Sequence, residues 1–211
     1  MPKTIVEGYE ERIPAVLTMM KRELLQGDGQ NVEGIFRLAP DKDDCNWVKK
    51  QINSGEFEGG CDVNVLANLI KVWFRDMPDS LYNNISESVI YQVADGDSLD
   101  LAPIESEFPE PTKSLLEWLL DLMAEIVQHE QVNRMSAKNM AIVMSPNLFS
   151  ISSDNPMVAL TMSQKVADFT TKLLAWRLRS KFGYDAGYQF QSIYDSLLQL
   201  IFFDLLPIGN V

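Results

Sequence analysis

Apolar residues recur at intervals of three and four along most of the chain, which is the spacing of helices that bury one face. The first such helix begins near Ile13, with Pro14 in its first turn, and ends at Gly27. The clearest pattern covers 112–129, where Trp118 and the methionine at 123 are expected in the core. Further helices are expected at 41–54, 62–77, 85–93, 136–145, 158–181 and 188–206. No alternating segment of convincing length predicts a strand, so the predicted fold class is all-α.

The helix at 62–77 carries two cations on one side. With Asp62 as its cap, we expect its buried stripe to be formed by Leu66, Leu69, Ile70 and Trp73. Lys71 and Arg75 then fall on the side away from the core. They either belong to an ordinary solvated face or contact something anionic.

The helix at 136–145 begins at a capping serine, Ser136, and its apolar run 140–144 predicts burial on most sides. Asn139 inside it needs a hydrogen-bond partner, most simply a loop backbone. Pro146 ends the helix and Asn147 follows in a turn. The Asn147 amide is either an ordinary turn group or a donor and acceptor for a neighbouring chain.

The segment 31–40, called the Arg37 loop below, joins the first two helices. Ile35, Phe36 and Leu38 are expected to pin its backbone into the core while the Arg37 guanidinium points out. Arginine cannot be deprotonated in proteins, and its planar fork of donors suits phosphate oxygens. The alternative is a surface arginine that closes a salt bridge.

Composition limits the classes of protein. The chain has 211 residues, of which 46% are hydrophobic and 23% charged, as expected for one soluble globular domain. Its net charge of −12 opposes binding to nucleic acid or to an anionic membrane surface. Two cysteines without metal-site spacing and a single histidine, His129, predict no metal site and no disulfide. No apolar run is long enough for an integral membrane segment and no signal sequence is evident, so a cytoplasmic location is expected.

Three separated stretches together resemble the RhoGAP domain, the activating module for Rho-family small GTPases. They are Glu33-Gly34-Ile35-Phe36-Arg37, the segment from Leu69 to Pro78, and the segment from Asn133 to Leu148. The resemblance covers residues 12–182, leaving an N-terminal extension at 1–11 and a C-terminal helical extension at 183–211. It implies a single multi-helix bundle with an additional C-terminal helix.

The resemblance also assigns roles to residues. Arg37 matches the family's arginine finger, Lys71 and Arg75 match the pair that supports the finger loop and the GTPase contact, and Asn147 matches a GTPase-contacting asparagine. Arg134 and Lys138 are further candidates for the interface, while Asn139 and Phe36 are expected to be structural residues near the site. The chain departs from the family pattern in two places. After the finger the family commonly has a small residue and then glycine, but this chain has Leu38-Ala39-Pro40. Ser80 stands where a second proline is usual.

The implied function is stimulation of GTP hydrolysis by a Rho, Rac or Cdc42-like GTPase, with the chain acting as a monomeric regulator rather than an enzyme. GTP and Mg²⁺ would belong to the partner, so no cofactor is expected. Recruitment to a membrane would come through the GTPase or flanking segments. Two alternatives stay open: a catalytically weak RhoGAP-like module that docks a GTPase or another signalling partner, and a helical scaffold whose likeness is architectural only.

Overall fold

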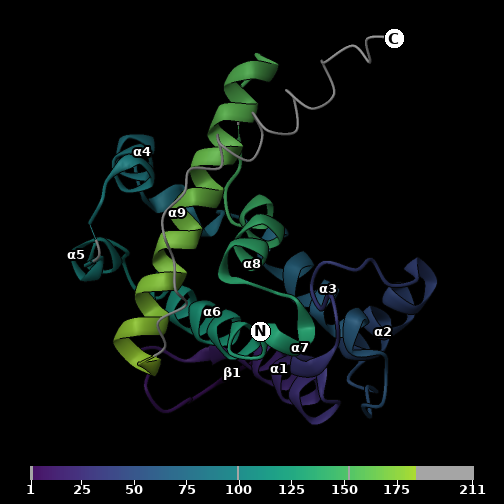
Figure 1. Cartoon of the computed structure of the whole chain (residues 1–211). Helices are drawn as coiled ribbons and strands as arrows, with labels where there is room; N and C mark the ends of the chain where they lie inside the picture. Colours follow the sequence, from purple (N-terminus) through teal and green to yellow (C-terminus); the bar gives the residue numbers. More distant parts are fainter. Residues whose placement is uncertain (1, 99, 152, 184–211) are drawn as a thin grey trace, which may run out of the picture.

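The chain folds into a bundle of helices with one minimal two-stranded sheet (Figure 1), as a computed structural model of residues 2–98, 100–151 and 153–183 shows. The all-α prediction is confirmed. The helices are α1 (Ala15–Gln26), α2 (Lys42–Ser54), α3 (Val63–Arg75), α4 (Glu87–Asp95), α5 (Ala102–Ser106), α6 (Thr112–Val127), α7 (Glu130–Asn133), α8 (Ala137–Met144) and α9 (Pro156–Phe182). Short 3₁₀ turns occur at η1 (Gly29–Asn31), η2 (Leu81–Asn84) and η3 (Ser145–Asn147), and the strands are β1 (Lys3–Thr4) and β2 (Ile13–Pro14).

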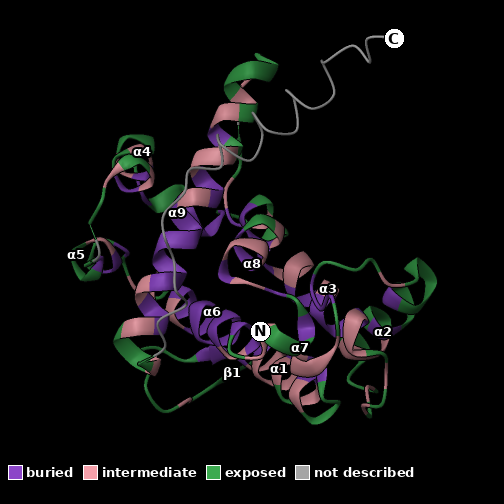
Figure 2. Ribbon diagram, in the orientation of Figure 1, coloured by how far each residue is buried: buried purple, intermediate pink, exposed green. Residues whose placement is uncertain are grey.

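The long helix α9 organises one side of the bundle and α3 the other. Helix α9 packs against α4, α6 and α8, whereas α3 packs against α1 and α2 (Figure 1). The turn η3 contacts both α3 and α9 and so links the two groups. Buried residues concentrate on α6 and along the inner side of α9, while α2 and α4 carry exposed outer faces (Figure 2).

Aromatic side chains join the elements in one core. The Tyr82 ring meets the Phe169 ring of α9 edge to face at 5.1 Å, and the Phe74 ring of α3 stacks at 6.4 Å on Trp118 of α6. All four side chains are at most 2% exposed. Each such ring removes a large apolar area from water, so this cluster is a main source of the stability of the fold.

Several predicted helix ends are confirmed by their caps. The Asp62 carboxylate accepts from the Asn64 amide at 2.9 Å, and the Ser136 hydroxyl accepts from the Asn139 amide at 3.1 Å. Gly183 ends α9 in the left-handed region at φ 60°. These short-range signals work because an unpaired backbone group at a helix end needs a local partner.

Other expectations were wrong in detail. Phe74, and not Trp73, completes the buried stripe of α3, because the stripe continues from Ile70 toward Trp118 of α6. Trp73 is only half-buried. Ile142 is 45% exposed, so α8 is not buried on most sides. Pro14 lies in β2, where it pairs with Lys3, and is not in the first turn of α1. The predicted helix at 188–206 lies outside the described residues.

A buried cluster of charges ties the N-terminal segment to α6 and α9. Arg177 of α9 donates from Nε and Nη2 to the two oxygens of Asp121 at 2.8 and 3.2 Å, and from Nη1 to Glu105 at 3.3 Å. Asp121 also accepts from the Tyr9 hydroxyl at 2.5 Å and from Lys181 Nζ at 2.6 Å. The segment before α1 is therefore held on the bundle through Tyr9, although the sequence predicted only an extension there.

Asp121 is expected to stabilise the fold above about pH 4 and to lose that contribution in acid. Burial alone would raise its pKa, but hydrogen bonds from Arg177, Lys181 and Tyr9 outweigh burial and hold the pKa below the usual value. The unfolded chain therefore binds a proton here at higher pH than the native protein does, so stability falls as pH drops. Urea unfolding of wild type and Asp121→Asn checks this, because the stability gap between them should narrow toward acid. A gap independent of pH would contradict it.

Candidate functional site

The Arg37 loop is anchored in the core by the residues that precede Arg37. Ile35 and Phe36 are at most 1% exposed and belong to the core, while Arg37 is exposed. Leu38 is 49% exposed, so the expectation that it also pins the loop was wrong. Its side chain instead lies over Gly34, where an added Cβ would come within 3.0 Å of Leu38 Cγ. The guanidinium is thus carried by a backbone that is fixed immediately before it.

The backbone at Phe36 has the left-handed conformation, with φ 67°. A side chain larger than glycine destabilises this conformation by roughly 1–2 kcal/mol, so surrounding contacts must hold it. The Phe36 ring is buried, and its carbonyl accepts a hydrogen bond from Lys71 Nζ of α3 at 2.5 Å. Arg37 N and Leu38 N both donate to the Gly34 carbonyl at 2.9 Å, which closes the turn. Burial and these bonds together point Arg37 away from the core.

Lys71 is held against the loop rather than in solvent. It is half-buried, and burial lowers the pKa of its ammonium group. Its position on the helix side away from the core was predicted from the sequence, and that side faces the Arg37 loop. The ammonium therefore supports the loop through a neutral carbonyl, and its charge stays close to Arg37.

The Arg37 guanidinium has no carboxylate partner among the residues that the structure describes. Arg75, one turn beyond Lys71, is exposed and lies 3.4 Å from the Asp76 carboxylate next to it. Arg134 is exposed too. It directly follows Asn133, whose carbonyl accepts a hydrogen bond from Gly34 N. The structure thus brings Arg37, Lys71 and Arg134 to one region.

Lys138 is oriented differently. Burial raises the pKa of Asp168 in α9, and Lys165, Lys172 and Lys138 oppose that rise. Lys138 is therefore close to α9.

The two asparagines make backbone contacts. Asn139 Nδ2 donates to the Arg134 carbonyl at 3.1 Å, so its partner is a loop backbone. Asn147 Nδ2 donates to the carbonyls of Val143 and Met144 at 3.1 and 3.3 Å, which closes the end of α8. Its amide nitrogen is therefore occupied within the chain, and η3, which carries it, packs against α3.

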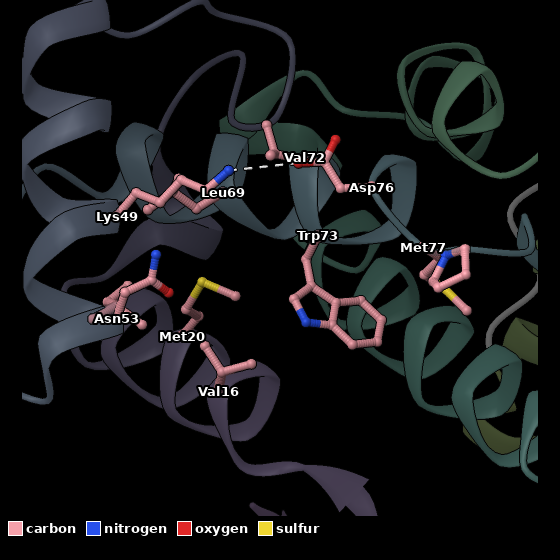
Figure 3. A pocket seen from close by; sticks show the side chains of 11 residues that line it. Val16, Met20, Lys49, Asn53, Leu69, Val72, Trp73, Asp76 and Met77 are labelled. Atoms are coloured by element: carbon pink, nitrogen blue, oxygen red, sulfur yellow. Dashed lines mark hydrogen bonds and ion pairs between the residues drawn. The ribbon is translucent and has the colours of Figure 1, made fainter. Parts of the chain in front are cut away.

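An apolar groove of about 420 Å³ lies beside the site but does not include it (Figure 3). It is formed between α1, α2 and α3 and is lined by Met20, Leu69, Trp73 and neighbours, with the Lys49 and Asp76 ion pair across its rim at 3.5 Å. Trp73 faces this groove, which explains its partial exposure. Neither Arg37 nor Lys71 lines it.

Gly34→Ala is expected to destabilise the protein more than Gly55→Ala. Both glycines have positive φ, at 72° and 77°, so both substitutions carry the left-handed strain of roughly 1–2 kcal/mol. A Cβ at Gly34 would also lie 3.0 Å from Leu38 Cγ, whereas one at Gly55 would meet nothing within 4 Å. Urea unfolding measures the difference, and the excess at Gly34 should shrink in a Leu38→Ala background. Equal losses at the two sites would show that Leu38 does not restrict the loop.

Comparison with known families and proteins gives a consistent result. The family model of the RhoGAP domain matches residues 14–153. The Rho GTPase-activating protein gacA of Dictyostelium discoideum is 38% identical over 179 residues, which cover 84% of this chain and 52% of that protein. Rho GTPase-activating protein 3 of Arabidopsis thaliana is 32% identical over 187 residues, covering 87% of this chain and 40% of that protein. The chain thus spans about half the length, or less, of these relatives.

Solved structures share the fold. The crystal structure of the BH domain from Graf, the GTPase regulator associated with focal adhesion kinase, superposes with a TM-score of 0.65 at 15% identity, covering 79% of this chain and 94% of that one. Human Rho GTPase activating protein 15 superposes with a TM-score of 0.65 at 17% identity, covering 78% of this chain and 83% of that one. At such identities the likeness concerns the arrangement of helices. In the described residues, moreover, no helix is both long and apolar enough to cross a bilayer.

Proposed function

The chain belongs to the RhoGAP domain family, and from that premise we propose that it stimulates GTP hydrolysis by a Rho-family small GTPase through Arg37. The observation that carries the proposal is the exposed Arg37 guanidinium, set on a turn that Lys71 supports at the Phe36 carbonyl. A cation placed beforehand stabilises the charge that develops on a transferring phosphoryl group. Arg37 would supply that charge to a site on another protein.

The partner would supply the rest of the chemistry. GTP, Mg²⁺ and the residue that orients the attacking water belong to a GTPase in this reaction. This chain would contribute the finger, the support of the finger by Lys71, and a docking surface that includes Arg75 and Asn147. Because the Asn147 amide nitrogen is bound to its own helix, a contact from Asn147 to the GTPase would use the side-chain oxygen as an acceptor.

Single-turnover GTP hydrolysis with a panel of Rho, Rac, Cdc42 and Ras-like GTPases tests the proposal. We expect acceleration with at least one Rho-type member and little with the Ras-like one. Binding to a GTPase without acceleration would favour the alternative of a weak docking module. Neither binding nor acceleration across the Rho-type members would overturn the proposed function.

A further inference from the structure

Asn133 belongs to the third family-like stretch, yet the function proposed above gives it no role. It is the last residue of α7 and is completely buried, with 0% exposure. A buried amide must find partners for two N–H groups and an oxygen. The identity of those partners shows what the residue holds together.

The Asn133 side chain connects three separate segments. Nδ2 donates to the Gln30 carbonyl in η1 and to the Ile126 carbonyl near the end of α6, both at 2.7 Å. Oδ1 accepts from the Met135 amide, also at 2.7 Å. Every hydrogen-bonding group of the side chain is therefore used, and its position relative to the start of the Arg37 loop is fixed.

The main chain of Asn133 extends this connection to Arg37. The Asn133 carbonyl accepts from Gly34 N at 2.8 Å, and the Gly34 carbonyl in turn accepts from Arg37 N. The side chain orients the Asn133 peptide, the peptide holds Gly34, and Gly34 closes the turn that carries Arg37. Lys71 supports the same turn from α3, so the loop is held between two elements.

We propose that Asn133 is a positioning residue for Arg37, an inference that rests on the proposed function. Its amide fixes the height and direction of the finger before a GTPase binds. A displacement of about 1 Å in a group that acts on the transition state can lower a rate roughly 100-fold. Loss of the Asn133 bonds should therefore reduce the rate of the chemical step more than it reduces binding.

Asn133→Asp is the most direct test, since it keeps the shape of the side chain and the acceptor for Met135 N. Ionised aspartate has no donor for Gln30 or Ile126, so we expect stimulated single-turnover hydrolysis at saturating domain to fall about 10- to 100-fold near neutral pH. The buried carboxyl should have a raised pKa. At lower pH it is protonated and regains one donor, so the rate relative to wild type at the same pH should recover as pH falls.

Binding measurements distinguish positioning from a general loss of structure. Asn133→Asp should weaken affinity for a GTPase carrying GDP and aluminium fluoride, a transition-state mimic, but change little with a non-hydrolysable GTP analogue. Ser114→Ala is the matched control, because Ser114 is also buried and also accepts from a backbone amide, that of Glu11, at the opposite end of α6. It should lower stability without changing the stimulated rate.

The outcomes are separable. A folded Asn133→Asp domain with the wild-type rate at all pH values overturns the inference and leaves the proposed function intact. If wild type and Arg37→Ala give equal rates, the proposed function itself is wrong. Should Asn133→Asp not fold, Asn133→Ser, whose shorter side chain can reach Met135 N only, is expected to show the same selective loss. Hydrogen exchange in wild type needs no variant: a Gly34 amide that exchanges as fast as an open loop amide would also overturn the inference.

Discussion

Arg37→Ala is expected to lower the GTP hydrolysis that this domain stimulates in a partner GTPase by about 10³- to 10⁵-fold, the range that an arginine finger contributes. The guanidinium would act on charge that exists mainly in the transition state, so its removal should spare most ground-state binding. The fold should be unaffected, because Arg37 is exposed and has no ion pair in the described part of the chain. Single-turnover hydrolysis with a responsive Rho-type GTPase measures the effect.

Two further variants make this measurement specific. Arg37→Lys should also be poor, since an ammonium group lacks the bidentate fork of a guanidinium. Arg22→Ala removes another exposed arginine, one whose side chain is 61% exposed on α1, and should leave the rate unchanged. Full activity of Arg37→Lys would reduce the role of Arg37 to simple charge, and an unchanged rate in Arg37→Ala would remove the finger assignment.

Arg177→Met is expected to destabilise the protein by about 3–5 kcal/mol. The Arg177 and Asp121 side chains are only 10% and 3% exposed, and their bidentate contact joins α9 to α6. Removing the guanidinium leaves the Asp121 and Glu105 carboxylates buried with fewer partners. A buried charge without its partner lowers the free energy of unfolding, because the charge has lost its hydration and gains no compensating contact. The midpoint of urea unfolding should fall accordingly.

Lys181→Met provides the matched comparison. Lys181 also contacts Asp121, at 2.6 Å, but its side chain is 42% exposed. Water can replace much of that contact, so the loss should be about 0–1 kcal/mol. If the two substitutions cost the same, burial of the Arg177 pair would not be the source of its contribution.

The sequence predicts those parts of the fold that depend on neighbours along the chain. Caps at Asp62 and Ser136 need only the next three residues, and the pattern of α6 is strong enough to place Trp118 in the core. The family resemblance is confirmed as well, because it uses three stretches in register. Such signals do not require knowledge of which helices meet.

Errors arise where a contact between distant segments decides the outcome. Helical spacing allows either Trp73 or Phe74 to be buried, and only the position of Trp118 selects Phe74. Ile142 stays exposed because no described element covers that side of α8, which its apolar run alone could not show.

Helical spacing alone could not show the supports of the Arg37 loop, although the family resemblance implied a supporting role for Lys71 and Arg75. The left-handed Phe36 and the Asn133 amide both depend on bonds to residues more than thirty positions away, at Lys71 and Gln30. Asn133 stands in a mostly polar stretch, residues 129–138, so no hydrophobic pattern in the sequence marked it as buried.

The bond between Lys71 and the Phe36 carbonyl has an electrostatic consequence. A carbonyl is neutral, so it holds the ammonium group in place without cancelling its charge. The chain as a whole carries −12, whereas Arg37 and Lys71 place two positive charges in one region, and these attract anions. Attraction of this kind weakens over a Debye length of about 8 Å at physiological ionic strength, so added salt should slow the encounter with an acidic surface while leaving the tightly packed helices unchanged.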